Sequence, residues 1–294
     1  MSKSMGKKFK TLVKERAPLQ VLGAINAYSA MLVEKAGGEA IYLSGAGVAN
    51  ASYGLPDLGM TGLADVLEDV RRVTAASSLP LLVDVDTGFG HMFHIARTVQ
   101  LMEAAGVAAI HIEDQVLAKR CGHRPNKAIV SMEEMGDRIK SAVDARIDPD
   151  FVIMARTDAY SILGMQAAID RASYCVELGA DMIFPEALTT LEEYREFISH
   201  VSVPVLANIT EFGKTPLFTK DELRQAGVDI ILYPLSAFRA MSQAAWNVYS
   251  AIINQGSQQS VLNSMQTRNE LYDVLKYQDF EKKLDQLMEE QDER

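Results

Sequence analysis

Cysteine, tryptophan and long apolar runs are all scarce in this chain of 294 residues, which has only two cysteines and one tryptophan. Two cysteines cannot build a disulfide framework, so we expect a cytoplasmic location. No apolar run approaches the roughly 18 residues that a transmembrane helix needs, so we expect no membrane partner. Positive charge is not in excess either. The net charge of −10 argues against a nucleic-acid partner, which requires basic faces.

The remaining composition is that of an ordinary globular protein, with 48% hydrophobic and 23% charged residues. The basic start, MSKSMGKKFK, has no apolar core of the kind that a signal peptide needs. No linker rich in proline or serine interrupts the chain. We therefore expect residues 1–294 to form one domain, with a helical extension over about 237–294.

Eight short apolar segments recur along the chain and predict strands that are buried on both faces. They cover residues 21–26, 40–45, 79–86, 108–114, 151–157, 182–187, 203–209 and 229–234. Helical spacing fills the gaps between them, for example over 94–106 and 165–179. Glycines follow several of these helices, as expected at left-handed helix caps. They are Gly37, Gly106, Gly179 and Gly227.

Strands alternating with helices predict an α/β fold, either a (β/α)₈ TIM barrel or a doubly wound open sheet. The positions of the polar residues favour the barrel, because nearly every strand ends in a charge or an amide. Barrels of this class assemble their sites at that edge. These strand-end residues are Asp84, Asp86, Glu113, Arg156, Glu186 and Asn208. Beyond Pro234 the pattern predicts helices over 237–255 and 260–276, followed by a solvated charged tail.

The segment DVDTGFG places two carboxylates, Asp84 and Asp86, on one face of the third strand. Such a pair repels unless a cation lies between its members, and hard oxygen ligands suit Mg²⁺ or Mn²⁺. Glu113 lies at the same level of the next strand, and Asp57 could reach the site from a loop. The alternative is a solvated strand end with helix-capping aspartates.

Several groups that can bind a carboxylate are predicted near the same edge. Arg156 ends an apolar strand and offers a planar fork that matches a carboxylate. Glu186 could hold a substrate hydroxyl or an arginine. Backbone amides of SGAG, residues 44–47, can approach an anion closely. Further candidate donors are Asn208, Thr210, Arg239 and Arg268, although any single arginine could equally be a surface ion pair.

The segment KRCGHRPNK, residues 119–127, surrounds Cys121 with cations and a glycine. Such surroundings lower the pKa of a thiol and leave it reachable. With a divalent cation nearby, this suggests carbon–carbon cleavage next to a carboxylate, in which Lys119 and His123 tune the thiol to supply a proton. The alternatives are an inert exposed thiol or a zinc ligand. Cys175 lies on a helical pattern and is expected in the core.

Together, KRCGH, DVDTGFG, HIEDQ, FPEA and ANITEFGKTPLFT closely resemble the isocitrate lyase and phosphoenolpyruvate mutase superfamily, from about Leu19 to about Gln278. The mutase branch lacks the K-x-C-G-H loop, so its isomerase chemistry is disfavoured. Arg120 and the compact length favour a methylated substrate over isocitrate. The resemblance implies a lyase that cleaves 2-methylisocitrate to pyruvate and succinate within propionate catabolism.

The resemblance also implies the residue roles. Mg²⁺ would be held by Asp84 and Asp86, with Asp57 and Glu113 reached through water. The proton donor would be Cys121, and the base would be Tyr42 or Glu113. The substrate-binding positions would be Ser44, Gly45, Ala46, Cys121, Gly122, Arg156, Glu186, Asn208, Ile209, Thr210, Arg239 and Arg268. Ala46 stands where relatives often have glycine.

The assembly implied by the resemblance is a homotetramer whose C-terminal helices, 237–255 and 260–276, are exchanged between subunits. Two other functions are compatible with these residues. The first is an isocitrate lyase or a related lyase of a 2-hydroxy diacid. The second is a catalytically silent barrel that senses carboxylates.

Overall fold

The computed structural model describes residues 4–120, 122–123 and 126–292, and it contains the eight predicted strands. Seven strands lie within their predicted segments, and β1 overlaps its segment but begins two residues earlier, at Leu19. The strands are β1 Leu19–Gly23, β2 Ile41–Leu43, β3 Leu81–Asp84, β4 Ala109–Glu113, β5 Val152–Thr157, β6 Met182–Pro185, β7 Leu206–Asn208 and β8 Ile230–Tyr233.

The strands form one parallel sheet in the order β6-β5-β4-β3-β2-β1-β8-β7. A parallel bridge between Ile183 and Val205 joins the two ends of this sheet, and the Ile183 amide donates to the Pro204 carbonyl at 3.0 Å. The sheet is therefore closed. This confirms the (β/α)₈ barrel and rules out the open, doubly wound sheet.

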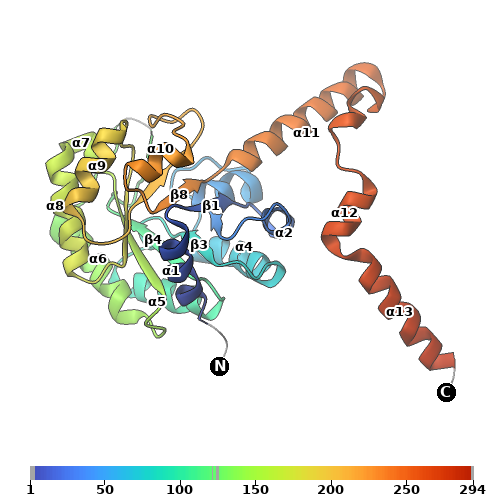
Figure 1. Ribbon diagram of the computed structural model, residues 1–294, viewed down its shortest axis with the longest axis horizontal. Helices are drawn as coiled ribbons and strands as arrows, with labels where there is room; N and C mark the ends of the chain where they lie inside the picture. The colour runs from blue at the N-terminus through green and yellow to red at the C-terminus, as the bar shows by residue number, and fades with distance from the viewer. Residues whose placement is uncertain (1–3, 121, 124–125, 293–294) are drawn as a thin grey trace. The chain divides into compact units, whose positions relative to one another are not determined.

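Helices follow the strands and surround the barrel (Figure 1). In the order of the chain these elements are α1 Met5–Arg16, α2 Ala27–Lys35, α3 Gly45–Gly47, the π-helix η1 Val48–Ser52, α4 Leu63–Ala76, α5 Met92–Ala104, α6 Met132–Ala145, α7 Tyr160–Leu163, α8 Met165–Glu177, α9 Leu191–His200 and α10 Lys220–Gln225. The predicted caps at Gly37, Gly106, Gly179 and Gly227 have φ angles of 83°, 81°, 101° and 87°. Each is the left-handed conformation in which glycine avoids a side-chain clash.

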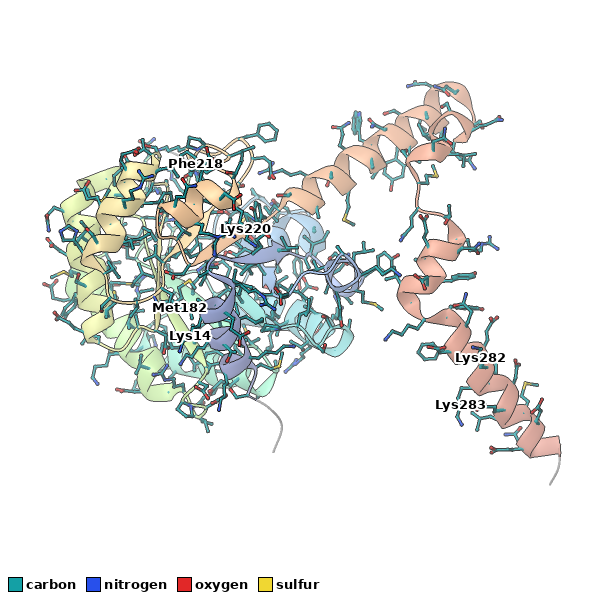
Figure 2. The ribbon with its side chains drawn as sticks, viewed as in Figure 1. Lys14, Met182, Phe218, Lys220, Lys282 and Lys283 are labelled. Atoms are coloured by element: carbon teal, nitrogen blue, oxygen red, sulfur yellow. The ribbon has the colours of Figure 1, made fainter. Side chains whose placement is uncertain are left out.

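Two apolar clusters stabilise the barrel, one inside the sheet and one outside it. The inner cluster contains alternate strand residues such as Val21, Leu82 and Met154. Met182, labelled in Figure 2, belongs to it. The outer cluster, which includes Ile112 and Ile153, packs the other face of the strands against the helices. Strands buried on both faces explain why these segments are almost continuously apolar.

Helix α1 precedes the first strand and contributes Phe9 and Val13 to the inner cluster. Phe9 is fully buried. We expect Phe9→Ala to lower the free energy of unfolding by about 3–5 kcal/mol, since it removes a large buried side chain and leaves a cavity. Urea denaturation would measure this, with Phe93→Ala as the control. Phe93 is 80% exposed, and its replacement is expected to cost about 0.5 kcal/mol or less.

The C-terminal part of the chain, from Arg239 onward, forms a separate compact unit. It contains most of α11 Ser236–Gln255, the 3₁₀-helix η2 Gln259–Ser264, α12 Arg268–Leu275 and α13 Tyr277–Asp292, from which Lys282 and Lys283 project (Figure 2). The predicted helix over 260–276 was wrong as one element. It divides at residues 265–267, where the Thr267 side chain accepts from the Glu270 amide and starts a new helix.

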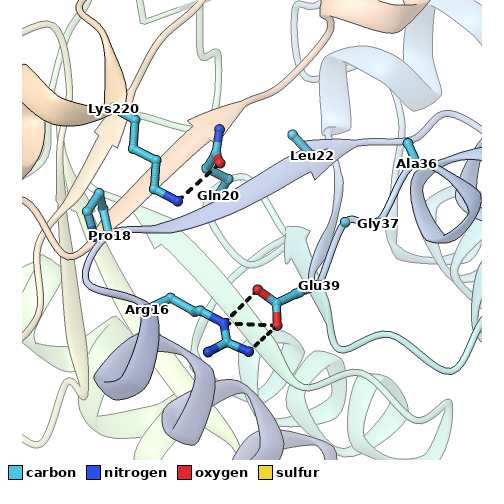
Figure 3. Close-up of a pocket in the computed structure, with 9 residues that line it drawn as sticks. Arg16, Pro18, Gln20, Leu22, Ala36, Gly37, Glu39 and Lys220 are labelled. Carbon is cyan, nitrogen blue, oxygen red and sulfur yellow. Dashed lines mark hydrogen bonds and ion pairs between the residues drawn. The ribbon is translucent and has the colours of Figure 1, made fainter.

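Two further observations concern the described residues as a whole and one surface hollow. Among the described residues, no helix combines the length and the apolar character needed to cross a membrane. A hollow of about 180 Å³ beside the start of β1 is lined by charged groups that are already paired (Figure 3). There Arg16 binds Glu39 at 2.7 Å, and Lys220 donates to the Gln20 side chain at 3.3 Å. The opposite, carboxyl-terminal end of the strands is where barrels of this class carry their sites.

Candidate active site

Two aspartates meet at the carboxyl end of β3. The Gly45 amide donates to Asp84 Oδ2 at 3.0 Å, and the Asp86 amide donates to Asp84 Oδ1 at the same distance. A Cβ atom on Gly45 would lie 3.1 Å from an Asp84 oxygen and 3.2 Å from an Asp86 oxygen. Both carboxylates therefore border Gly45. Asp86 lies beyond the end of the strand with a φ angle of 49°, so a turn rather than strand alternation places it there.

A lysine ammonium lies between carboxylates at this position. Lys119 Nζ is 2.5 Å from Asp86 Oδ1 and 2.6 Å from Asp57 Oδ1. Burial works to lower the pKa of Lys119, but the surrounding carboxylates raise it, and the side chain stays charged. Burial and the charge of Asp84 raise the pKa of Asp86 to about 7. Lys119 was predicted only to tune a thiol. The structure shows in addition that it contacts two acids directly.

The residues fit a divalent cation. Apart from the ion pair with Lys119, Asp86 Oδ1 has no hydrogen-bond partner within the described chain, and neither does Glu113 Oε1. Both atoms are buried, and burying a carboxylate oxygen that has no partner, as at Glu113 Oε1, is costly. Burial also raises the pKa of Glu113 well above its usual range. Among the described residues, no three acidic, cysteine or histidine side chains are close enough together to hold a metal ion as they stand. The positive charge next to Asp86 is the Lys119 ammonium.

Two buried rings, those of Tyr42 and His111, lie next to these carboxylates. The Tyr42 hydroxyl lies 2.9 Å from His111 Nε2 and 3.5 Å from Asp84 Oδ2. The rings of Tyr42 and His111 stack with centroids 5.7 Å apart. Burial lowers the pKa of His111 to about 4, so the ring is neutral at pH 7. Burial also raises the pKa of Tyr42 well above its usual range, so its hydroxyl stays protonated.

Arg156 connects the acids of three neighbouring strands. Its guanidinium lies 3.0 Å from Glu186 Oε2, 3.1 Å from Asp158 Oδ2 and 3.4 Å from Glu113 Oε2. The guanidinium carbon stands 5.0 Å above the Phe184 ring. Strand register pairs Glu113 with Arg156 and Arg156 with Phe184, so the cluster follows directly from the parallel sheet.

Glu186 is held from several sides. His123 Nε2 lies 3.2 Å from Glu186 Oε1, and Asn208 Nδ2 donates to the same oxygen at 3.4 Å. Burial works to raise the pKa of Glu186, but the charge of Arg156 and the hydrogen bond from His123 lower it below its usual range. The other ring nitrogen of His123 accepts from the Lys214 amide at 3.0 Å. His123 therefore links segment 119–127 to the loop after β7.

Gly122 shows how closely this segment approaches the site. A Cβ atom there would lie 2.5 Å from both Arg156 Nη2 and Glu186 Oε2. No larger residue fits without moving one of these two side chains. Cys121, the predicted proton donor, lies outside the described residues.

The structure brings many of the predicted site residues to one end of the barrel. Those linked there by direct contacts are Gly45, Asp57, Asp84, Asp86, Glu113, Lys119, His123, Arg156, Glu186 and Asn208. Ser44 precedes Gly45 as the cap of α3, and Ala46 is half-buried. Ile209 and Thr210 follow β7 and are buried. Arg239 and Arg268 belong to the second unit, so their role stays a prediction.

Three buried residues in contact with this cluster were missed from the sequence: His111, Lys127 and Asp158. Asp158 has no exposed surface, and its Oδ1 lies 2.5 Å from Lys127 Nζ. The position of Asp158, directly after β5, carries the same strand-end signal that singled out Glu186. Nothing in the local sequence distinguishes Lys127 from a surface lysine.

Residues 9–253 match the model of the family described as phosphoenolpyruvate phosphomutase. The chain belongs to this family. One curated relative, the 2-methylisocitrate lyase of Vibrio cholerae serotype O1, is 61% identical over 293 residues, which cover 98% of this chain and 95% of the relative. The superfamily predicted from the motifs is thereby confirmed.

Two solved structures share the fold of this chain. A 2,3-dimethylmalate lyase, described as a PEP mutase/isocitrate lyase superfamily member, is 31% identical with a TM-score of 0.88, covering 95% of this chain and 94% of that one. A phosphonopyruvate hydrolase in complex with oxalate and Mg²⁺ is 28% identical with a TM-score of 0.83, covering 95% and 97%.

Proposed function

We propose that this protein is a carbon–carbon lyase that cleaves 2-methylisocitrate to pyruvate and succinate. One observation carries the proposal. At the same end of the barrel, several carboxylates suited to a cation lie next to the Arg156 cluster, which is suited to a carboxylate substrate. The name of the Vibrio cholerae relative, at 61% identity, supports the same substrate.

The metal in this proposal is Mg²⁺, with Mn²⁺ as a substitute. Asp84 and Asp86 would hold it directly, while Asp57 and Glu113 would reach it through water. When bound, it supplies a Lewis acid that polarises the hydroxyl and carboxylate of the 2-hydroxy acid end of the substrate. The Glu113 Oε1 atom, which has no hydrogen-bond partner within the described residues, supports this assignment, as does the Mg²⁺ bound to the related phosphonopyruvate hydrolase.

Mg²⁺ binding should strengthen with pH. The pKa of Asp86 is about 7, and the cation requires the deprotonated carboxylate. The acid is mostly protonated at pH 6 and mostly ionised at pH 8, so affinity should rise about tenfold between them and level off above pH 8. Titration calorimetry in buffers of different ionisation enthalpy would measure both the affinity and the released proton. Equal affinities at the two pH values would contradict the assignment.

Side chains of the protein carry out the remaining steps. A base removes the substrate hydroxyl proton. Of the two predicted candidates, Glu113 fits this role better than Tyr42, because the buried Tyr42 hydroxyl stays protonated. The carbon–carbon bond breaks as the hydroxyl becomes the ketone of pyruvate, and its electron pair stays on the succinate fragment. Arg156, Asn208 and Thr210 stabilise the charge that develops there. Cys121 donates the proton that completes succinate.

Substrate preference tests the proposal directly. The two substrates differ by one methyl group, and a well-fitted apolar pocket discriminates about 10–200-fold on that basis. We expect kcat/KM for 2-methylisocitrate to exceed that for isocitrate within this range. A coupled assay of pyruvate and glyoxylate release with each tricarboxylate would measure it. A preference for isocitrate would reverse the assignment, and no turnover of either tricarboxylate with Mg²⁺ would favour the carboxylate sensor.

We further propose that the protein is a cytoplasmic homotetramer that exchanges its C-terminal helices, within residues 237–276, between subunits. Large apolar side chains are exposed on the second unit of the single chain, where an interface would cover them. Trp246 is 69% exposed, Ile253 82% and Phe280 73%. Sedimentation equilibrium of the full chain would test this assembly, and a monomer at micromolar concentration would reject it.

A further inference from the structure

The segment that carries KRCGH leaves and re-enters the barrel at one point. Gln115 and Ile129 form an antiparallel bridge just after β4, and the Val116 amide donates to the Ala128 carbonyl at 3.0 Å. Both ends of the intervening segment are therefore anchored at the edge of the site. Two buried side chains near these anchor points turn back into the segment.

The first of these side chains is Gln115, which has no exposed surface. Its amide nitrogen donates to the Arg120 carbonyl at 2.8 Å, and its oxygen accepts from the Arg120 amide at 3.0 Å. One side chain thus satisfies both backbone groups of Arg120. This two-point contact fixes the orientation of the peptide immediately before residue 121.

The second side chain is Lys127, which is 2% exposed. Its ammonium donates to the Gly122 carbonyl at 2.6 Å and lies 2.5 Å from Asp158 Oδ1. The other oxygen of Asp158 accepts from Arg156 Nε at 3.1 Å. The Gly122 carbonyl is therefore connected, through Lys127 and Asp158, to the guanidinium assigned to the substrate.

The backbone at Gly122 packs tightly against the site. A Cβ atom there would come within 2.5 Å of Arg156 Nη2 and Glu186 Oε2, so the backbone already lies against both side chains. A displacement of this peptide therefore disturbs Arg156 or Glu186. Nothing in the reaction as proposed above uses Gln115, Lys127 or Asp158.

We propose that Gln115 and Lys127 are positioning residues for proton transfer, acting by holding the backbone of Arg120 and of Gly122, the two neighbours of Cys121 in the sequence. The inference rests on the proposed function. In the step concerned, the carbon–carbon bond has broken and its electron pair lies on the succinate fragment. The thiol proton passes to that carbon, and the thiolate later regains a proton from water. Gln115 and Lys127 neither give nor take this proton.

The kinetic test compares Gln115→Met and Lys127→Met with two matched controls. Both variants keep an unbranched side chain of similar size and lose the polar contacts. A displacement of about 1 Å can cost about 100-fold in rate, so we expect kcat to fall by about that factor and KM to change much less. The controls are Lys8→Met and Gln166→Met, which remove similar exposed contacts to Ser78 and Asp170 and should leave kcat unchanged.

Isotope stereochemistry separates positioning from a general structural effect. In D₂O the wild-type enzyme should place deuterium on succinate in one configuration, because a fixed thiol delivers it from one side. Gln115→Met and Lys127→Met should give a mixture, since water then competes with the thiol. An unchanged kcat overturns the inference. A lowered kcat with the single configuration retained also overturns it, because it shows a merely structural role.

A measurement independent of turnover keeps this inference distinct from the proposed function. In a Cys175→Ser background, the rate of alkylation of Cys121 by iodoacetamide, followed by mass spectrometry, reports how the segment is held. We expect at least a fivefold change in either variant. A rate within twofold of wild type overturns the inference. Wild-type protein that releases no pyruvate defeats the proposed function, while the alkylation rates still decide whether the two side chains hold this segment.

Discussion

Replacing Cys121 by serine should lower kcat by about 10²–10⁴-fold while KM changes little. The hydroxyl of serine is a far weaker acid than a thiol, and general acid catalysis contributes a factor of this size. The proposed function assigns substrate binding to other groups, above all the paired Arg156 and Glu186, so binding should persist. Steady-state measurement of pyruvate release from 2-methylisocitrate would test this expectation.

Cys175 supplies the matched control, since the chain has only two cysteines. Cys175 is 3% exposed on α8, and burial raises the pKa of its thiol to about 12. Cys175→Ser should retain wild-type kcat. If Cys121→Ser also retained wild-type kcat, the proton would have to come from another group, and the assignment of Cys121 would be wrong.

Removing divalent cations should lower turnover below detection, and adding Mg²⁺ should restore it. Polarisation of the hydroxy acid requires a Lewis acid, and no side chain of the site supplies one. Dialysis against EDTA followed by titration with Mg²⁺ or Mn²⁺ would measure the recovery. Full turnover after exhaustive chelation would show that Asp84 and Asp86 do not hold a metal that the reaction needs.

A pair of variants locates the cation within the chain. Asp86→Asn removes a charge that the proposal assigns to metal binding, so the Mg²⁺ concentration for half-maximal activity should rise at least tenfold. Asp144→Asn removes a charge from an exposed ion pair with Lys140 on α6, and it should leave that concentration unchanged. Equal midpoints in the two variants would place the cation elsewhere.

The barrel was predictable because its strands carry an unusually direct signal. Strands buried on both faces are nearly continuous in apolar residues, and glycines such as Gly106 and Gly179 mark the preceding helix ends. The predicted helix over 260–276 failed for a local reason. Thr267 and Glu270 form a reciprocal cap within it, and this short polar pattern was outweighed by the apolar spacing around it.

The site was predictable where residues end strands, because parallel strands bring their ends to one edge. Asp84, Glu113, Arg156 and Glu186 were all found in this way. The contacts of loop residues could not be found, since they depend on how a loop folds back. Lys119 lies against Asp86 and Asp57, which are 33 and 62 positions away in the sequence, and no local pattern indicates that meeting.

The ammonium of Lys119 has a consequence for how the protein is made. Because it lies against Asp57 and Asp86, folding does not have to bring bare negative charges together. The folded chain thus carries an internal counterion at the place where the proposed function puts magnesium. Under that proposal, loading the metal would exchange one positive partner for another and would not be a condition for reaching the native fold.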